Sequence, residues 1–190
     1  MDLVIASNNK HKVKEIRAIL SGKFAHIYSL SDLSITVDPD ETAPDFYGNA
    51  LIKARSVAAF TDKAVLADDS GLEVSFLGGA PGVHSARYAG EPVSDERNNE
   101  KLLAEMLNAE DRSARFVTTI VLLFPNGETL VGLGEVKGRI LRECKGENGF
   151  GYDPLFYADE LRKTFGEATE EEKNRVSHRS RALKDLIAKL

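Results

Sequence analysis

Two adjacent carboxylates, Asp68 and Asp69, follow the apolar run 64–66 in the segment ADDSGL. An ionised carboxylate that leaves water is costly unless it is paired, hydrogen-bonded or bound to a metal. The pair therefore predicts a solvated turn, an internal hydrogen-bonded network or a metal site. Because successive side chains of a strand point to opposite faces, we expect one carboxylate to face a cleft and the other to order a turn that interrupts the strand.

Oxygen ligands for a metal are available near this segment. Glu41 and Asp40 lie in a loop before an expected helix, and Glu73 follows the motif. Such hard ligands suit Mg²⁺, which keeps several waters and is shared with substrate phosphates. For Asp40 and Glu73 we favour solvated surface side chains. For Glu41 the choice between a solvated side chain and a metal ligand stays open. With one cysteine, Cys144, and four histidines without HExxH spacing, the chain has no cysteine-rich zinc site and is not typical of a zinc hydrolase.

The turn 7–12, SNNKHK, lies between an expected strand and an expected helix. Exposed N–H groups and the positive end of the helix dipole make such a turn a natural anion site. Its lysines are unfavourable at that end of a helix, and a bound phosphate would remove the conflict. In the alternative interpretation, Ser7 or Asn8 caps the helix and the lysines point into water.

Two further stretches could hold a base. The loop 146–154, GENGFGYDP, alternates glycines with aromatic residues, which could stack on a base or anchor the loop to the core. His178 and Arg179 open the last helix, and Arg179 offers only donors, so it matches a carbonyl acceptor.

The elements that must position these residues are read from apolar spacing and turn signals. Strands are expected over 3–6, 25–30, 63–74, 115–124 and 128–141, and helices over 9–20, 46–60, 94–107 and 177–190. Asn126-Gly127 between the last two strands predicts a hairpin. The pattern predicts an α/β fold with a mixed twisted sheet and flanking helices.

Composition limits the class of protein. The chain has 190 residues, 42% hydrophobic and 29% charged, which fits one globular domain, 1–190. No apolar run is long enough for a membrane span and MDLVIASNNK does not resemble a secretory leader, so we expect a cytoplasmic protein without a membrane partner. The net charge of −5 argues against a protein that coats nucleic acid.

These motifs, in this order, resemble the inosine triphosphate pyrophosphatase family, also described as Ham1-like or RdgB-like. The turn 7–12 fits its S/T-x-N-x-x-K motif, and Glu41, Asn49-Ala50 and Lys53 fit its next block. ADDSGL, LGGAPGVHSARYAG over 77–90, GFGYD over 149–153 and Ser177-His178-Arg179 complete the set. The resemblance implies two lobes around a central nucleotide-binding cleft, a homodimer, and Mg²⁺-dependent hydrolysis of ITP, dITP and XTP to the monophosphate and pyrophosphate.

The resemblance also implies roles for individual residues. Asp69 would act as the base toward water, and Glu41 and Asp69 would hold the metal. The substrate-binding set would be Ser7, Asn8, Asn9, Lys10, His11, Lys12, Lys53, Ser70, Phe150, Gly151, Tyr152, Asp153, Lys173, His178 and Arg179. Three positions depart from the family pattern: Asn8 replaces a glycine, His11 replaces a small residue, and Gly48 stands where an acid is frequent.

Two rival functions remain. A nucleotide-binding regulator without hydrolysis would not require two carboxylates facing a polyphosphate. A module that recognises hypoxanthine in a nucleic acid strand is disfavoured by the acidic net charge. Hydrogen-bond donors from His178 or Arg179 would pair with the 6-keto oxygen of a purine and clash with the 6-amino group of adenine. Guanine also has a 6-keto group, so this argument does not explain how guanine is rejected.

Overall fold

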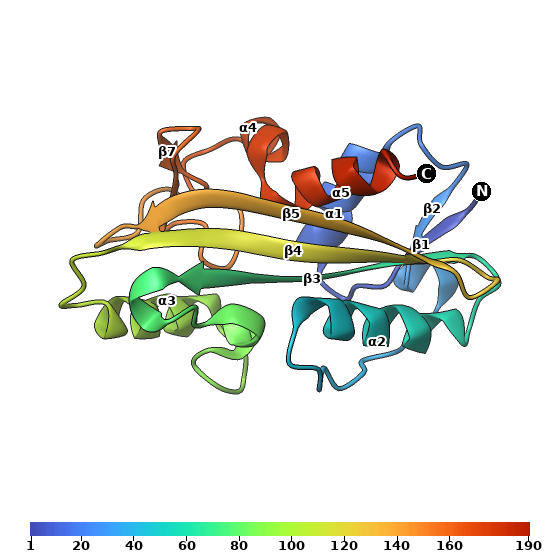
Figure 1. Cartoon of the computed structure of the whole chain (residues 1–190), viewed down its shortest axis with the longest axis horizontal. Helices are drawn as coiled ribbons and strands as arrows, with labels where there is room; N and C mark the ends of the chain where they lie inside the picture. The colour runs from blue at the N-terminus through green and yellow to red at the C-terminus, as the bar shows by residue number, and fades with distance from the viewer. The chain divides into compact units, whose positions relative to one another are not determined.

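The computed structural model describes all 190 residues and contains a seven-stranded sheet in the order β2-β1-β3-β4-β5-β6-β7 (Figure 1). The strands are β1 (Leu3–Ile5), β2 (Ile27–Ser29), β3 (Ala64–Val74), β4 (Ser113–Leu123), β5 (Thr129–Ile140), β6 (Phe156–Ala158) and β7 (Lys163–Thr164). The α-helices are α1 (Lys10–Leu20), α2 (Phe46–Ala58), α3 (Asp95–Glu105), α4 (Glu170–Val176) and α5 (His178–Ile187). Short 3-10 helices cover Ser31–Leu33, Ser75–Leu77 and Gly82–Arg87. None of the helices has the length and apolar character needed to cross a membrane.

The sheet is mixed, which confirms the expected fold class. β1 pairs in parallel with β2 and β3, whereas β5 with β6 and β6 with β7 are antiparallel. The expected hairpin joins β4 to β5, and its turn is closed by the Phe124 N–H donating to the Glu128 carbonyl at 2.9 Å.

The chain folds into two compact units. Unit 1 comprises Met1–Asp69, Thr118–Gly134 and Arg179–Leu190, and unit 2 comprises Ser70–Val117 and Glu135–His178. β3, β4 and β5 contribute residues to both units. The presence of two units agrees with the two expected lobes, while the nucleotide-binding cleft stays a prediction.

Unit 1 has helices on both faces of its strands. Apolar side chains of β1 alternate between two clusters, so that Leu3 and Ile5 pack with α1 and α5 while Val4 packs with α2. Figure 1 shows α1 and α5 on one side of the strands and α2 on the other. All three residues of β1 are buried, which is typical of a parallel strand covered on both faces. The opening strand, the first helix and α2 are therefore confirmed.

The sequence sets the ends of the first helices. The Asn9 side chain caps α1, and the helix buries Val13, Ile16 and Leu20, which share one face at helical spacing. Asp45 caps α2 by accepting from the Gly48 N–H at 2.7 Å. Both caps fall on polar residues directly before an apolar repeat, which is why these helix starts could be predicted.

The expectation that the double carboxylate interrupts β3 was wrong. The strand runs without a break from Ala64 to Val74, and Asp68 and Asp69 lie inside it, 2% and 6% exposed. Each carboxylate has a cationic partner from a different helix, so the strand buries both without turning toward solvent. The solvated-turn interpretation is thereby excluded.

Unit 2 is built around one apolar cluster, to which α3 contributes Leu102 and the residue that caps its C-terminus, Met106. Three aromatic rings lie at its centre: the Phe116 and Phe156 ring centroids are 4.6 Å apart, and those of Phe156 and Phe165 are 5.3 Å apart. The helix expected over 94–107 is confirmed as α3, with Ser94 as its cap. This cluster anchors the loop that leads into β6.

Three elements of unit 2 were not predicted from the sequence. β6 and β7 are only three and two residues long, too short for a periodic pattern. α4 carries a capping box in which Thr169 and Glu172 each accept a hydrogen bond from the other's backbone N–H. Its T-x-x-E spacing is the signal that could have identified the helix.

Candidate active site

The turn after β1 is built as a helix cap. The Asn9 side-chain oxygen accepts from the backbone N–H groups of His11 at 3.0 Å and Lys12 at 3.2 Å, and the Ser7 hydroxyl oxygen accepts from the Asn9 N–H at 3.2 Å. The helix is thus capped by Asn9, and not by Ser7 or Asn8 as in the alternative interpretation of this turn. The cap uses the backbone N–H groups of the first helical turn and does not involve the Lys12 side chain, which can extend toward β3.

Asn8 replaces glycine in this turn without backbone strain. The only non-glycine residues with positive φ are Ser34 and Arg162, so Asn8 does not need the left-handed conformation. Its side-chain amide donates to the Val37 carbonyl at 3.0 Å and ties the turn to the loop before α2. A cavity of about 540 Å³ in unit 1 is lined by Ser7, Asn8 and Lys10, by further residues of α1 and by the segment 29–32.

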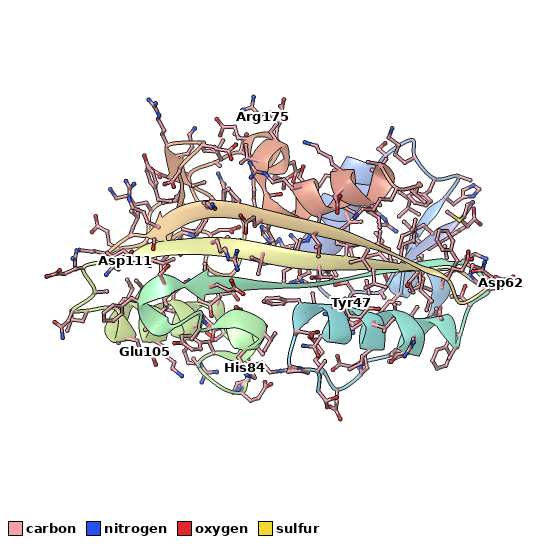
Figure 2. All side chains as sticks on the ribbon, viewed as in Figure 1. Tyr47, Asp62, His84, Glu105, Asp111 and Arg175 are labelled. Carbon is pink, nitrogen blue, oxygen red and sulfur yellow. The ribbon has the colours of Figure 1, made fainter.

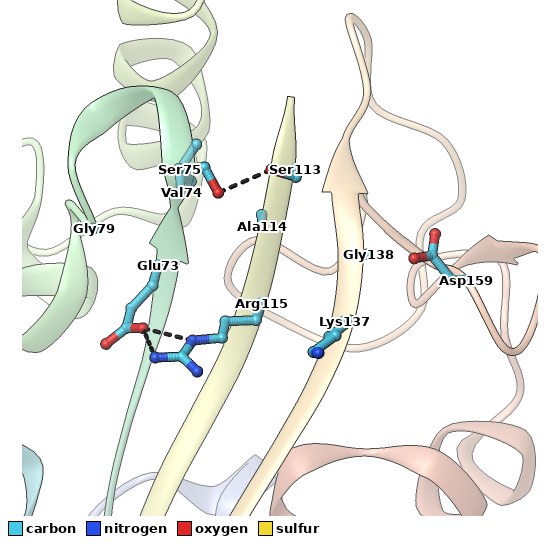
Figure 3. Close-up of a pocket in the computed structure, with 10 residues that line it drawn as sticks. All are labelled: Glu73, Val74, Ser75, Gly79, Ser113, Ala114, Arg115, Lys137, Gly138 and Asp159. Atoms are coloured by element: carbon cyan, nitrogen blue, oxygen red, sulfur yellow. Dashed lines mark hydrogen bonds and ion pairs between the residues drawn. The ribbon is translucent and has the colours of Figure 1, made fainter. Parts of the chain in front are cut away.

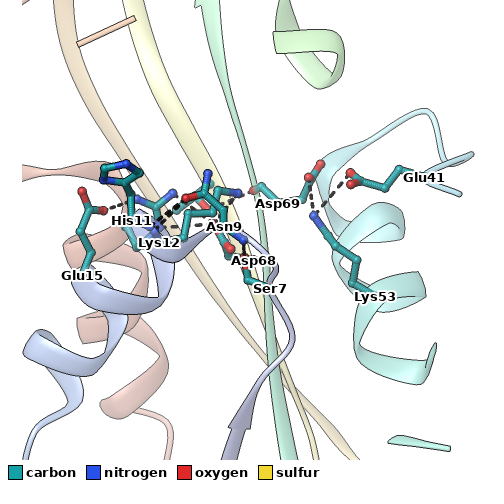
Figure 4. A network of polar contacts seen from close by, with 11 residues as sticks. Ser7, Asn9, His11, Lys12, Glu15, Glu41, Lys53, Asp68 and Asp69 are labelled. Carbon is teal, nitrogen blue, oxygen red and sulfur yellow. Dashed lines mark hydrogen bonds and ion pairs between the residues drawn. The ribbon is translucent and has the colours of Figure 1, made fainter. Parts of the chain in front are cut away.

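Asp68 anchors a buried ionic network in unit 1. Its Oδ2 lies 3.1 Å from the Lys12 Nζ, 3.3 Å from the Arg179 Nε and 3.2 Å from the Arg179 Nη2 (Figure 4). The Arg179 Nη1 also donates to Glu15. Burial lowers the pKa of Lys12, and the attraction of Asp68 opposes this shift. Asp68 therefore fits the internal-network interpretation, and it orients the Lys12 side chain of the turn 7–12.

Asp69 points to the other side of β3, where Lys53 lies between two carboxylates. The Lys53 Nζ is 2.8 Å from the Asp69 Oδ1 and 3.4 Å from the Glu41 Oε2 (Figure 4). The Thr118 hydroxyl donates to the Asp69 carbonyl at 3.0 Å and fixes the backbone there. The expectation that the two adjacent carboxylates do not face the same ligand is confirmed.

The charge state of Asp69 is set by its burial. Desolvation raises the pKa of Asp69 to about 6, although the nearby Lys53 ammonium lowers it. Burial alone would lower the pKa of Lys53, but attraction by Asp69, Asp68 and Glu41 outweighs it and raises that pKa. The pair is therefore ionic at neutral pH, with an aspartate whose proton affinity is suited to a general base.

Glu41 and Asp69 fit a divalent cation. The Asp69 Oδ2 is buried and has no hydrogen-bond partner, so one oxygen of this carboxylate is available to a ligand. No group of three or more acidic, histidine or cysteine side chains gathers anywhere in the chain. Two carboxylates suit an ion such as Mg²⁺ that keeps several waters and shares its shell with phosphates, and do not suit an all-protein cage.

Two residues that the sequence reasoning did not assign hold the Glu41 loop. The Asn49 side-chain oxygen accepts from the Ala43 N–H at 2.9 Å, and Asn49 is 2% exposed. A Cβ on Gly48 would lie 2.4 Å from the Ala43 Cβ, so the loop packs on α2 only because residue 48 is glycine. This close approach explains the absence of an acid at position 48.

In unit 2, the glycine and aromatic loop is fixed by Asp153. Its Oδ2 accepts from the Phe150 N–H at 3.0 Å and from the Lys173 Nζ at 2.7 Å. The same ammonium lies 4.7 Å from the centroid of the Phe150 ring. A Cβ on Gly149 would lie 2.0 Å from the Asp153 Oδ2, so this position requires glycine. Phe150, Asp153 and Lys173 are therefore brought together, while their expected role in positioning a nucleotide stays a prediction.

Helix α3 holds the middle of this loop. The Asp95 Oδ2 accepts from the Gly151 N–H at 2.8 Å, and the Asn99 amide donates to the Gly151 carbonyl at 3.0 Å. Neither residue was singled out from the sequence. The available signal was a pair of polar residues four apart on an amphipathic helix. In the structure Asn99 is only 8% exposed. They position the backbone between Phe150 and Tyr152.

The remaining predicted residues of unit 2 lie in or near its core. The Tyr152 hydroxyl donates to the Ser85 carbonyl at 2.6 Å, and burial raises the pKa of Tyr152 above its usual range. His178 is 5% exposed and stacks on Phe116 with ring centroids 4.9 Å apart. Ser70 is half-buried on β3. The nucleotide-binding roles of these residues stay predictions.

Burial separates the basic side chains of α4. Lys173 is 4% exposed, whereas Arg175, two residues later on the same helix, points outward (Figure 2). A second cavity, of about 470 Å³, contains none of the predicted residues (Figure 3). There Arg115 is held by Glu73 and Glu135, each at 2.7 Å, so Glu73 serves an ion pair rather than a metal.

Comparison with known proteins gives relatives of the same length. Residues 3–189 match the sequence model of the Ham1 family. The dITP/XTP pyrophosphatase of Clostridium perfringens is 48% identical, with 96% of this chain and 94% of that protein covered. The dITP/XTP pyrophosphatase of Bacillus subtilis is 45% identical, with 97% and 94% covered.

Solved structures agree with the sequence comparison. The Staphylococcus aureus Ham1 protein is 45% identical and superposes with a TM-score of 0.88, covering 99% of this chain and 97% of that one. A HAM1 protein from Coxiella burnetii is 39% identical and superposes with a TM-score of 0.89 over the same shares of the two chains.

Proposed function

Because this chain belongs to the Ham1 family, we propose that it hydrolyses deaminated purine nucleoside triphosphates such as ITP, dITP and XTP to the monophosphate and pyrophosphate. Relatives of nearly equal length are named dITP/XTP pyrophosphatases. The observation that carries the proposal is the buried Asp69 carboxylate, which keeps one oxygen without a hydrogen bond beside Lys53 and Glu41.

The reaction needs a water molecule to be activated and a polyphosphate to be neutralised. Asp69 accepts the proton of the water, which adds to phosphorus as the anhydride bond between the α- and β-phosphates breaks. Lys12 and Lys53 neutralise charge on the pyrophosphate that leaves, and Ser7 and Asn9 contact the phosphates. Mg²⁺ held by Glu41 and Asp69 would stabilise negative charge on phosphate oxygens when bound.

Base binding is assigned to unit 2. The Phe150 ring offers a stacking surface, and its position is fixed by Asp153 and Lys173. His178 would donate to the 6-keto group, which adenine lacks. Arg179 is also expected to bind the nucleotide. Its contacts with Asp68 and Glu15 support a second role, in which it orients Lys12 through Asp68.

Several finer points belong to the same proposal. The ion is Mg²⁺, the protein is a homodimer without nucleic acid or membrane partners, and residues 1–190 act as a single domain. The expected location is the cytoplasm, where the nucleotide pool that the reaction acts on is found. The family resemblance supports all of these points. The two hard oxygen ligands, Glu41 and Asp69, support only the choice of Mg²⁺.

The alternative is a regulator that binds the nucleotide without cleaving it. Binding alone would be weakened by a carboxylate with a free oxygen near polyphosphate, whereas hydrolysis uses it. The names of the relatives also favour hydrolysis.

Product analysis tests the proposal. The protein is incubated with Mg²⁺ and, separately, with ITP, XTP, dITP, ATP and GTP, and pyrophosphate and orthophosphate are assayed side by side. We expect pyrophosphate with monophosphate from ITP, XTP and dITP, and little product from ATP and GTP. Orthophosphate as the first product, or no product from any nucleotide, would contradict the proposal.

A further inference from the structure

The Lys53 ammonium lies where the two metal-holding carboxylates converge. It contacts the Asp69 Oδ1 at 2.8 Å and the Glu41 Oε2 at 3.4 Å, and its side chain is 15% exposed. Its two partners come from separate segments, the loop before α2 and strand β3. Asp69 is buried and Glu41 is exposed, so a single positive charge compensates two carboxylates at the boundary between the protein interior and solvent.

A divalent cation on the same carboxylates would compete with Lys53. Two positive charges a few ångströms apart repel strongly where water is scarce, because the effective dielectric constant is low. Lysine can leave, since its charge sits at the end of a flexible four-carbon stem, but departure leaves the ammonium without its ionic partners. An incoming polyphosphate would supply a new anionic partner.

We propose that Lys53 acts as the resident cation of Glu41 and Asp69 in the unloaded protein, so that a divalent metal binds these carboxylates strongly only together with a polyphosphate. The inference rests on the proposed function, in which the two carboxylates hold the metal. Lys53 exchanges its carboxylate partners for phosphate oxygens as the nucleotide arrives. Metal and nucleotide then each raise the affinity of the protein for the other, as thermodynamic linkage requires.

Metal binding without turnover provides the test. Mn²⁺ is titrated into the full-length protein at pH 8 and free Mn²⁺ is followed by electron paramagnetic resonance, with and without the α,β-imido analogue of ITP. Titration of the analogue alone corrects for its own Mn²⁺ binding. In wild type, we expect the protein to bind Mn²⁺ at least about tenfold more tightly with the analogue than without it.

Lys53→Met removes the charge but keeps most of the side-chain length. It should bind Mn²⁺ without analogue about tenfold more tightly than wild type, and the effect of the analogue should shrink by the same factor. Lys53→Gln gives the same readout if the methionine variant does not fold. The matched control is Lys63→Met, which removes a partly exposed lysine paired with Asp62 and should behave as wild type.

The inference is overturned if wild type binds Mn²⁺ equally well with and without the analogue, or if the folded Lys53 variants bind it no more tightly than wild type. Glu41→Gln separates this failure from failure of the proposed metal site. If Glu41→Gln weakens Mn²⁺ binding in the presence of the analogue, the carboxylate assignment stands and only the role of Lys53 is rejected. If it has no effect, the metal site itself is wrong.

Discussion

Two of the ionic clusters of the molecule, one in each unit, are built differently. In unit 1, Lys53 lies between Asp69 and Glu41, and one Asp69 oxygen is buried without a hydrogen bond. In unit 2, Lys173 pairs with Asp153 at 2.7 Å, and the same carboxylate oxygen also accepts a backbone N–H. The first cluster has acceptor capacity left for a ligand, whereas the second uses its ionic contacts to hold the shape of a loop.

This difference indicates that the unit 1 cluster is suited to binding a ligand and to catalysis, whereas the unit 2 pair positions a loop. Changes in the unit 1 cluster, or in the Lys12–Asp68 pair of the same unit, should reduce catalysis more than folding stability. Changes in the unit 2 pair should do the reverse. The following predictions test that contrast from the largest expected effect to the smallest.

Lys12→Met removes one cation from the phosphate turn. Loss of a buried charged contact costs several kcal/mol, so we expect kcat/KM for ITP to fall about 10³-fold. Folding stability should change little, because Arg179 still contacts Asp68. Steady-state kinetics and urea denaturation measure the two effects. Lys14→Met, an exposed lysine on the same helix, is the control, and an equal loss in both variants would contradict the specific role of Lys12.

Lys173→Met should produce the opposite balance. The variant leaves the buried Asp153 carboxylate without its cation, and we expect a loss of about 3 kcal/mol in the free energy of unfolding. In the folded protein kcat should fall less than KM rises. Lys163→Met breaks a more exposed pair with Glu172 and should cost less than about 1 kcal/mol. Equal destabilisation by the two variants would show that burial of the Lys173 pair does not matter.

Asn49→Ala removes the acceptor that holds the Glu41 loop through the Ala43 N–H. A lost buried hydrogen bond costs roughly 1 kcal/mol, so about fivefold more Mg²⁺ should be needed for half-maximal activity. Asn108→Ala, an exposed asparagine, should leave the Mg²⁺ requirement unchanged. An unaltered requirement in Asn49→Ala would remove the loop from metal binding.

The pKa of Asp69 gives the smallest and most direct electrostatic readout. Its carboxyl carbon should titrate at about pH 6 by NMR in the unloaded protein, above the ordinary 3.8. Because the folded-state pKa is raised, the contribution of Asp69 to stability is complete below pH 3.8 and is lost as pH rises through 6. Lys53→Met should raise the midpoint further. A lower midpoint in that variant would contradict the ion pair.

The sequence predicted local features well. Apolar repeats and turn signals, Asn-Gly among them, identified α1, α2, α3 and the hairpin, because these signals depend on neighbouring residues. It missed β6 and β7, whose few residues carry no periodicity; β6 pairs with β5, and β7 pairs with β6. It also placed a break in β3. A double carboxylate inside a strand is unfavourable unless both groups are paired, and the sequence does not show the partners.

Those partners are distant in the sequence. Arg179 and Asp68 are 111 residues apart, and no spacing rule relates them. The motifs identified the residue types of the site, but not that Arg179 contacts carboxylates or that Lys53 joins Glu41 to Asp69. Positioning residues such as Asn49 and Asp95 were missed because their role lies in a backbone contact with another segment.

The central claim, that Asp69 is the base for pyrophosphate release, is tested most directly by Asp69→Asn in the pyrophosphate assay with ITP and Mg²⁺. Asp62→Asn, at a side chain that is 94% exposed, is the matched control. We predict that Asp69→Asn lowers kcat about 10³-fold while the folded variant still binds the α,β-imido analogue, and that Asp62→Asn behaves as wild type. Pyrophosphate release by Asp69→Asn at close to the wild-type rate would contradict the account.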